Sequence, residues 1–229
     1  MKKYIDITGT INTGMWKYDD PFTDIQIKPF PAIGWLKDAT YGLEFFEGFH
    51  SQSGTFIETP AHAYGNRNSY AVIDIPPEKM IDVPCVVLNL GMWDMDPALG
   101  RRPMTVKDLE SCFNAKDIRE GDAIILGTGY GRYWFHPKNL DYAPYMTKEA
   151  MDWLLDKKPV AIGSDSTRWD VLDNPQGFWD EFYAADVLLI GPFVDLERCS
   201  APRCKLTILP PKFPISSCVP ARAFIIEED

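Results

Sequence analysis

The sequence contains no apolar run as long as the roughly 18 residues that a membrane-spanning helix needs. Its N-terminus, MKKYIDITGTI, has lysines but no apolar segment behind them, so no signal peptide is visible. Positive charge is also scarce, and the formal net charge is −10 at pH 7. Because nucleic acids and anionic membranes both recruit basic surfaces, we expect a cytoplasmic protein that binds neither of them.

Paired cysteine motifs are absent as well. The chain has five cysteines, an odd number, and none of them forms a CxxC pair. This usage favours reduced thiols in the cytoplasm over a disulfide framework. No histidine lies in a recognisable partner position for Cys199, Cys204 or Cys218, so all three are interpreted as small core or surface residues rather than nucleophiles.

The pattern along the chain predicts an α/β protein. Hydrophobic residues make up 45% and charged residues 24% of the 229 residues, which is the balance of an ordinary globular domain. Short apolar runs such as CVVLNL, AIILG and VLLIG alternate with helical segments such as MTKEAMDWLLDKK in the middle, while both ends are rich in strands. We therefore expect one domain over residues 1–229, with a mixed central sheet, flanking helices and an extra β layer.

Residues 10–35 are predicted to form an irregular N-terminal arm with a short strand at 24–27. The segment is rich in proline, glycine and aromatic residues, and long irregular segments in compact domains are commonly functional or interface-forming. Its aromatic side chains are Trp16, Tyr18, Phe22, Phe30 and Trp35.

The run FHSQSGTFIETPAHAYG, residues 49–65, concentrates possible metal ligands. If the run is extended, alternation places on one face His50, Gln52, Gly54, Phe56 and Glu58. His62 follows the turn expected at Pro60. Imidazole and carboxylate groups suit zinc or manganese, whereas the amide of Gln52 is a weak neutral ligand. The same run also fits a plain extended segment that ends in a turn.

Part of this run, QSGTFIETPAH, resembles the signature H-x-G-T-H-x-D-x-P-x-H of the cyclase family that includes bacterial kynurenine formamidase and isatin hydrolase. The residues that match it in register are Gly54, Thr55, Pro60 and His62. Glu58 stands at the position of the family's aspartate ligand, while Gln52 and Phe56 stand at its first two histidine positions.

Further segments resemble the family in the same order. They are YIDITGTINTGMWKYDDPF, GDAIILGTGYGRYW, APYMTKEAMDWLLDKKPVAIGSDSTRWD and SSCVPARAFII. The resemblance implies the swivelling β/β/α fold and a homodimer or homotetramer. It also implies hydrolysis of a small amide or lactam by water that a divalent metal activates, assisted by a histidine on a helix and a glutamate on the next strand.

This sequence departs from that pattern at the downstream pair. Trp179 or Asp180 stands at the position of the family's histidine, and Gly191 at that of its glutamate. We therefore predict Asp180 as the proton carrier, and a zinc or manganese site made of Glu58 and His62 with His50 or Gln52. Glu58 is predicted to serve catalysis as well as the metal.

The predicted substrate is a small amide, lactam or lactone. The resemblance places the arm beside the pocket, so Trp16 or Tyr18 is expected to contact a flat, apolar substrate, together with Phe56. Arg168 is a candidate partner for a substrate carboxylate. Asp165 either faces the pocket or shapes a turn. The alternative, raised by the missing histidines, is an inactive family member that binds a small molecule or serves as a structural subunit.

Overall fold

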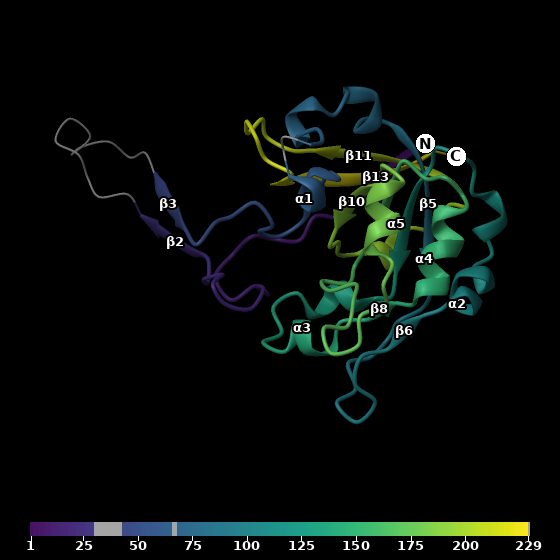
Figure 1. Cartoon of the computed structure of the whole chain (residues 1–229), viewed down its shortest axis with the longest axis horizontal. Helices are drawn as coiled ribbons and strands as arrows, with labels where there is room; N and C mark the ends of the chain where they lie inside the picture. Colours follow the sequence, from purple (N-terminus) through teal and green to yellow (C-terminus); the bar gives the residue numbers. More distant parts are fainter. Residues whose placement is uncertain (30–42, 66–67, 229) are drawn as a thin grey trace.

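The computed structural model describes residues 1–29, 43–65 and 68–228 (Figure 1). Its main feature is a nine-stranded sheet with the order β1-β13-β11-β5-β7-β9-β10-β4-β12. In this order the strands are β1 (Lys2–Asp6), β13 (Arg222–Glu228), β11 (Cys204–Leu209), β5 (Val83–Asn89), β7 (Ala123–Gly127), β9 (Ala161–Ser164), β10 (Leu188–Gly191), β4 (Phe56–Glu58) and β12 (Cys218–Pro220).

The sheet is mixed. Strands β5, β7, β9 and β10 run parallel to one another, whereas the strand pairs on either side of this block are antiparallel. Every residue of β7, β9 and β10 is buried. Strands covered on both faces need continuous apolar runs, which is what the sequence has at these places. The fold class predicted from the sequence is thereby confirmed.

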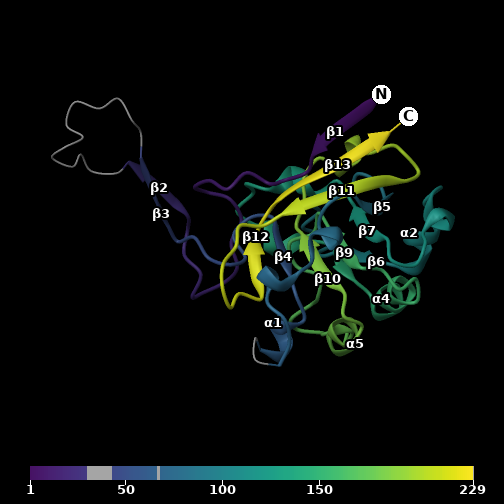
Figure 2. The ribbon, with the colours of Figure 1, turned by 90° about the horizontal axis from the view of Figure 1, so that it is seen from above.

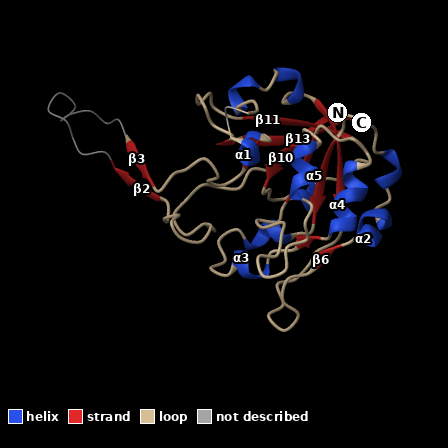
Figure 3. Ribbon diagram, viewed as in Figure 1, coloured by secondary structure: helices blue, strands red, loops and turns tan. Residues whose placement is uncertain are grey.

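Helices cover one face of the parallel block (Figure 3). They are α2 (Val106–Ser111), α4 (Lys148–Leu155) and α5 (Trp179–Ala184). Leu109, Leu154 and Phe182 pack from these helices into a common core with Val86 and Ile124 of the sheet.

The N-termini of two of these helices are fixed by threonine caps. The hydroxyl of Thr105 accepts a hydrogen bond from the backbone N–H of Asp108, and the hydroxyl of Thr147 accepts one from Ala150. Each cap satisfies a backbone N–H in the first turn of its helix and so defines where the helix begins.

The opposite face is covered by the other end of the same sheet. Strands β1, β13 and β11 curl over it (Figure 2). Ile5, Leu206 and Ile225 from this end share a second core with Ile125 and Ile190 of the parallel block. This curled end is the extra β layer expected from the strand-rich termini.

A hairpin of β2 (Gln26–Pro29) and β3 (Glu44–Glu47) projects away from the body in both views (Figures 1 and 2). It begins slightly later than the strand predicted at 24–27. Phe30 and Trp35 lie outside the described residues.

The remaining elements are short. They are β6 (Pro103–Met104), β8 (Tyr145–Met146), α1 (Ala61–Tyr64), α3 (Asn139–Tyr142) and the 3₁₀ turns η2 (Val72–Asp74), η3 (Pro77–Lys79), η4 (Ala115–Asp117), η5 (Tyr130–Tyr133) and η6 (Leu196–Arg198). None of the helices in the described ranges has the length and apolar character to cross a membrane. All five cysteines are free thiols.

Candidate metal centre

The extended conformation that would place His50 and Glu58 on one face is not formed. A turn replaces it: the backbone N–H of Ser53 donates to the carbonyl of His50, and the Ser53 hydroxyl accepts from the N–H of His50. Gly54 has φ of 74°, and a Cβ there would lie 2.7 Å from Ile11. Because only glycine adopts this conformation without strain, the strand begins after it, at Phe56.

The turn separates His50 from the rest of the signature. Its ring packs 4.6 Å from the ring of Phe22, and its Nδ1 accepts a hydrogen bond from the backbone N–H of Gln52. Burial lowers the pKa of His50. The potential ligands that come together among the described residues are Glu58, His62 and Cys218, so the structure does not bring His50 to the metal ligands predicted around it.

Strand pairing and a short helix create this cluster. Glu58 ends β4 and lies directly opposite Cys218 in the antiparallel pair of β4 and β12. Residues opposite each other in such a pair project their side chains on the same face. His62 comes four residues after Glu58, at the start of α1 just past Pro60, and its side chain turns back toward the Glu58 carboxylate.

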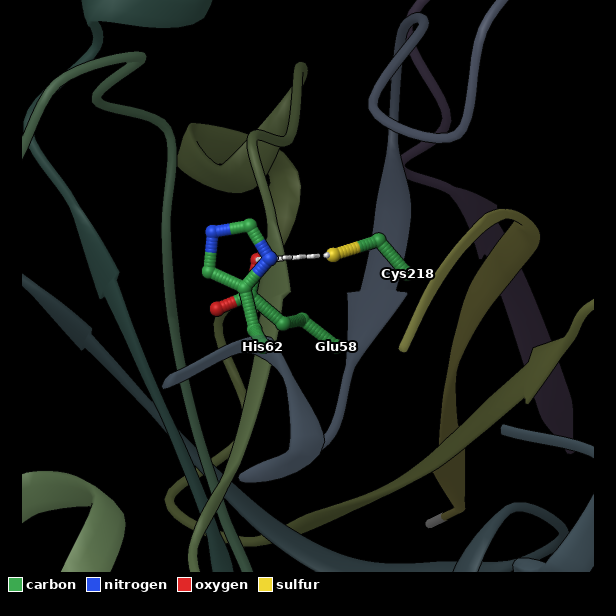
Figure 4. Close-up of side chains that lie close together, drawn as sticks. All are labelled: Glu58, His62 and Cys218. Carbon is green, nitrogen blue, oxygen red and sulfur yellow. Dashed lines mark hydrogen bonds and ion pairs between the residues drawn. The ribbon is translucent and has the colours of Figure 1, made fainter. Parts of the chain in front are cut away.

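The three side chains converge on one point (Figure 4). The Sγ of Cys218 lies 3.0 Å from Oε2 of Glu58 and 3.2 Å from Nδ1 of His62. The Nδ1 of His62 is 3.8 Å from Oε2 of Glu58. Glu58 and Cys218 are buried, while 42% of the His62 side chain is exposed.

Two further side chains hold the Glu58 carboxylate. The amide nitrogen of Gln52 donates to Oε2 over 3.1 Å, and the hydroxyl of Tyr183 donates to Oε1 over 2.8 Å. Tyr183 comes from α5, where its ring stacks on Trp179 at 5.7 Å. The indole N–H of Trp179 donates to Asp170 over 3.0 Å. A chain of contacts from Asp170 through Trp179 and Tyr183 thus holds Oε1 of Glu58, while Gln52 and Cys218 contact Oε2.

The thiol and tyrosine hydroxyl groups around Glu58 are kept protonated. Burial, and then the charge of Glu58, raises the pKa of the Cys218 thiol and of the Tyr183 and Tyr18 hydroxyls. A thiol with a raised pKa is a poor nucleophile, since the thiolate is the reactive form. Cysteine-based nucleophilic catalysis at Cys218 is therefore disfavoured without a cation at the cluster.

The cluster opens into a cavity of about 570 Å³. Most of its wall is apolar or aromatic, as is usual for pockets that take small molecules. Of the side chains predicted from the sequence, those in its wall are Tyr18, Gln52, Phe56, Glu58, His62 and Arg168. The guanidinium of Arg168 lies 2.6 Å from the carboxylate of Asp19 at this wall.

Besides His50, three predicted site residues do not line this cavity. Trp16 is buried 5.7 Å from the ring of Trp134 and belongs to the core. Asp180 is exposed on α5. Asp165 is buried and accepts hydrogen bonds from the N–H of Thr128 and of Tyr130, which is the turn-shaping role left open above. Burial raises the pKa of Asp165 to about 6, and these hydrogen bonds oppose the rise.

The donor set of the cluster fits a divalent metal ion. Ligand atoms at about 2.0–2.3 Å from a tetrahedral zinc lie roughly 3.3–3.6 Å from one another. The corresponding separations here are 3.0, 3.2 and 3.8 Å, with one sulfur, one nitrogen and one oxygen atom facing one another. Small movements of these side chains are enough to receive an ion.

Sequence reasoning missed Cys218 and Tyr183. Cys218 is separated from Glu58 by 160 residues, and only the pairing of β4 with β12 brings them together. Tyr183 lies on α5, on which the resemblance placed the proton carrier at Asp180 instead. The spacing of Trp179 and Tyr183, one helical turn apart, was the available signal that both face the same way.

Comparison with known families shows which family the chain belongs to. The family model described as "Putative cyclase" matches residues 5–171, which is 167 of the 229 residues. The chain therefore belongs to the cyclase family. Cys218 and Tyr183 both lie outside the matched segment. No curated protein matches the sequence.

Solved structures show the same fold along the whole chain. An isatin hydrolase bound to the product analogue thioisatinate has a TM-score of 0.81 at 15% identity, with 100% of this chain and 93% of that chain covered. Isatin hydrolase A from Ralstonia solanacearum has a TM-score of 0.77 at 18% identity, covering 99% and 92%. A predicted metal-dependent hydrolase from Bacillus stearothermophilus has a TM-score of 0.70 at 19% identity, covering 100% of both chains.

Proposed function

We propose that this protein is a metal-dependent hydrolase that acts on a small amide, lactam or lactone. The observation that carries the proposal is the meeting of three ligand atoms, from Glu58, His62 and Cys218, beside a cavity large enough for a small substrate. Two of the three residues, Glu58 and His62, line that cavity. These residues would hold a divalent ion. When bound, such an ion polarises a carbonyl group and lowers the pKa of water toward neutrality.

The aromatic side chains of the cavity favour a flat substrate. Tyr18, Phe56 and Trp179 line it, and flat apolar groups pack well against such rings. Arg168 is available for a substrate carboxylate, because its partner Asp19 is 73% exposed and free to turn toward solvent. Isatin hydrolases act on a compound of this flat kind, and N-formyl aromatic amines, the substrates of kynurenine formamidase, share its shape.

Tyr183 is the proton carrier that the geometry favours over Asp180. Hydrolysis places the hydroxyl of water on the carbonyl carbon and a proton on the leaving nitrogen or oxygen. Tyr183 lines the cavity, keeps its proton because its pKa is raised by burial and by Glu58, and hydrogen-bonds the carboxylate. The proton that the attacking water loses would return to Tyr183 through its hydrogen bond with Glu58, and so replace the proton that Tyr183 gives to the leaving group.

The direct test is a panel of N-formyl aromatic amines, isatin and simple lactones, assayed with added Zn²⁺ or Mn²⁺ and after chelation. We expect turnover of at least one compound, loss of it on chelation, and a loss of at least about 100-fold in kcat for Glu58→Ala and His62→Ala. Glu181→Ala is the matched control, since that glutamate is exposed on α5 and pairs with Lys148. Turnover that survives chelation would reject metal dependence.

The rival function is ligand binding without turnover. It is favoured by Gln52 and Phe56, which occupy the two positions where the family signature has histidine. A stable protein that binds members of the panel, shown by calorimetry, but leaves them intact with either metal present would favour this rival.

We also propose that the chain forms a homodimer or homotetramer through the β2–β3 hairpin. A two-stranded hairpin is marginally stable by itself, and Ile27 and Phe46 on it are 39% and 59% exposed. Light scattering should show a mass above 26.0 kDa that falls for Phe46→Ser but not for Phe113→Ser, an exposed phenylalanine on the body. An unchanged mass for Phe46→Ser would rule out this interface.

A further inference from the structure

Cys218 is a metal ligand candidate that the family signature does not contain. The signature ends at His62, and Cys218 lies on β12, beyond the segment that the family model matches. We propose that Cys218 binds the ion as a thiolate, so that the centre is a zinc site made of one cysteine, one histidine and one glutamate. This proposal rests on the metal of the proposed function but not on hydrolysis.

The strand register fixes the thiol at the cluster. Cys218 and Glu58 are direct partners in the β4–β12 pair, and β4 is itself held on its other edge by β10. The pairing therefore places both side chains on the same face of the sheet, where Sγ lies 3.0 Å from Oε2 of Glu58. His62 approaches the same sulfur from α1 at 3.2 Å. A preformed arrangement of this kind needs little reorganisation to bind an ion.

The identity of the donors selects the metal. Thiolate is a soft ligand that favours zinc, whereas manganese and magnesium prefer sites made of oxygen atoms. Phe56 and Gln52 replace the first two histidines of the signature, so His62 is the one nitrogen ligand that the signature supplies to the cluster. Cys218 adds the sulfur ligand. Three protein ligands leave one tetrahedral position open, which is the arrangement of catalytic rather than structural zinc sites.

Hydrogen bonds around the cluster suit this role. Tyr183 holds Oε1 of Glu58, so that Oε2 is the oxygen directed at Cys218 and His62. The hydroxyl of Ser217 lies 3.8 Å from Sγ of Cys218, where it can donate to a thiolate. Groups that hydrogen-bond the ligands in this way orient them and tune their affinity for the metal.

Metal content and cobalt absorption test the proposal on the whole protein. After purification without chelator, elemental analysis should find about one zinc per chain and little manganese. The metal-free protein reconstituted with Co²⁺ should show the strong near-ultraviolet charge-transfer band of a cobalt–thiolate bond. Manganese in place of zinc, or a cobalt complex without this band, would overturn the proposal.

Variants locate the sulfur. Cys218→Ser should remove the near-ultraviolet band and weaken Zn²⁺ binding by at least about 100-fold, because loss of a direct ligand costs more than the roughly 10–100-fold lost with a ligand's hydrogen-bonding partner. Cys199→Ser, which removes another buried thiol, should leave both unchanged. Equal zinc affinity in Cys218→Ser would contradict the assignment. If this variant does not fold, the cobalt spectrum of the unmodified protein decides.

The metal content and the cobalt–thiolate band can be measured whether or not the protein is a hydrolase. A zinc centre with the sulfur band, in a protein that hydrolyses nothing in the panel, would support the thiolate site and reject the hydrolase. Hydrolysis that depends on manganese without a sulfur band would do the reverse.

Discussion

Glu58 and Asp165 are two carboxylates with the same burial, each 2% exposed, and with opposite surroundings. Asp165 follows β9 and accepts hydrogen bonds from backbone N–H groups of Thr128 and Tyr130 in the neighbouring loop. Glu58 ends β4, and the groups within reach of its oxygens are side chains, those of Gln52, Tyr183 and Cys218.

This difference separates a carboxylate that holds a loop from one that could bind a metal ion. Backbone donors are fixed by the fold. The oxygens of Asp165 are already hydrogen-bonded to such donors and hold the loop in place. Side-chain partners such as a thiol and an imidazole can exchange a mutual hydrogen bond for a shared cation. Burial alone therefore does not identify the site; the kind of partner does.

The largest effect is expected from Asp165→Ala, which should lower the free energy of unfolding by at least about 3 kcal/mol. The substitution leaves buried donors of Thr128 and Tyr130 without an acceptor, and each such group costs about 1–3 kcal/mol. Urea denaturation of the metal-free protein measures this. A loss below about 1 kcal/mol would show that the loop does not depend on the carboxylate.

Glu58→Gln should have the opposite effects, with a large loss of zinc affinity and a small loss of stability. We expect Zn²⁺ affinity to fall at least about 100-fold, since a direct ligand is lost, while the metal-free protein loses less than about 1.5 kcal/mol of stability because the amide keeps the shape and an acceptor for Tyr183. Zinc titration and urea denaturation give the two values, with Glu181→Gln as the exposed control. Unchanged zinc affinity would remove Glu58 from the centre.

Tyr183→Phe should have a smaller effect on the metal. The variant keeps the ring that stacks on Trp179 and removes the hydroxyl that holds Oε1 of Glu58, so we expect Zn²⁺ affinity to fall by about 10-fold. Tyr64→Phe is the matched control, because that tyrosine is 43% exposed on α1. If the two variants bind zinc equally, the hydroxyl of Tyr183 does not position the carboxylate.

The smallest effect is expected from His50→Ala. His50 packs on Phe22 outside the cluster, so the variant should bind Zn²⁺ within about 2-fold of the unmodified protein. A loss comparable to that of His62→Ala would restore His50 to the ligand set predicted from the sequence and contradict the turn at residues 50–54.

Local features of the sequence predict much of this fold. The buried runs become β5, β7, β9 and β10, and the threonine caps start α2 and α4. These elements depend on residues close together in the chain, such as Thr105 and Asp108. Glu58 and His62 were likewise predicted together, because four residues and a turn connect them.

The site residues that the sequence did not place correctly depend on a backbone turn or on pairing between distant strands. Alternation along an extended segment would place His50 on the same face as Glu58. The left-handed conformation of Gly54 interrupts the extended backbone, so β4 begins only at Phe56 and the side chain of His50 points elsewhere. Cys218 was interpreted as a small core or surface residue, and it is buried. Its place beside Glu58 was not predicted, because no local pattern indicates that β12 pairs with β4. Register between strands distant in the sequence is set by the whole sheet, so a ligand contributed in this way is not visible from spacing.

Anomalous X-ray diffraction at the zinc edge tests most directly whether Glu58, His62 and Cys218 form one metal centre, as we propose. Crystals grown without chelator should show a single strong peak bounded by Oε2 of Glu58, Nδ1 of His62 and Sγ of Cys218. Crystals grown with added Zn²⁺ that show no peak at this point, or a peak that excludes the sulfur of Cys218, would contradict the account.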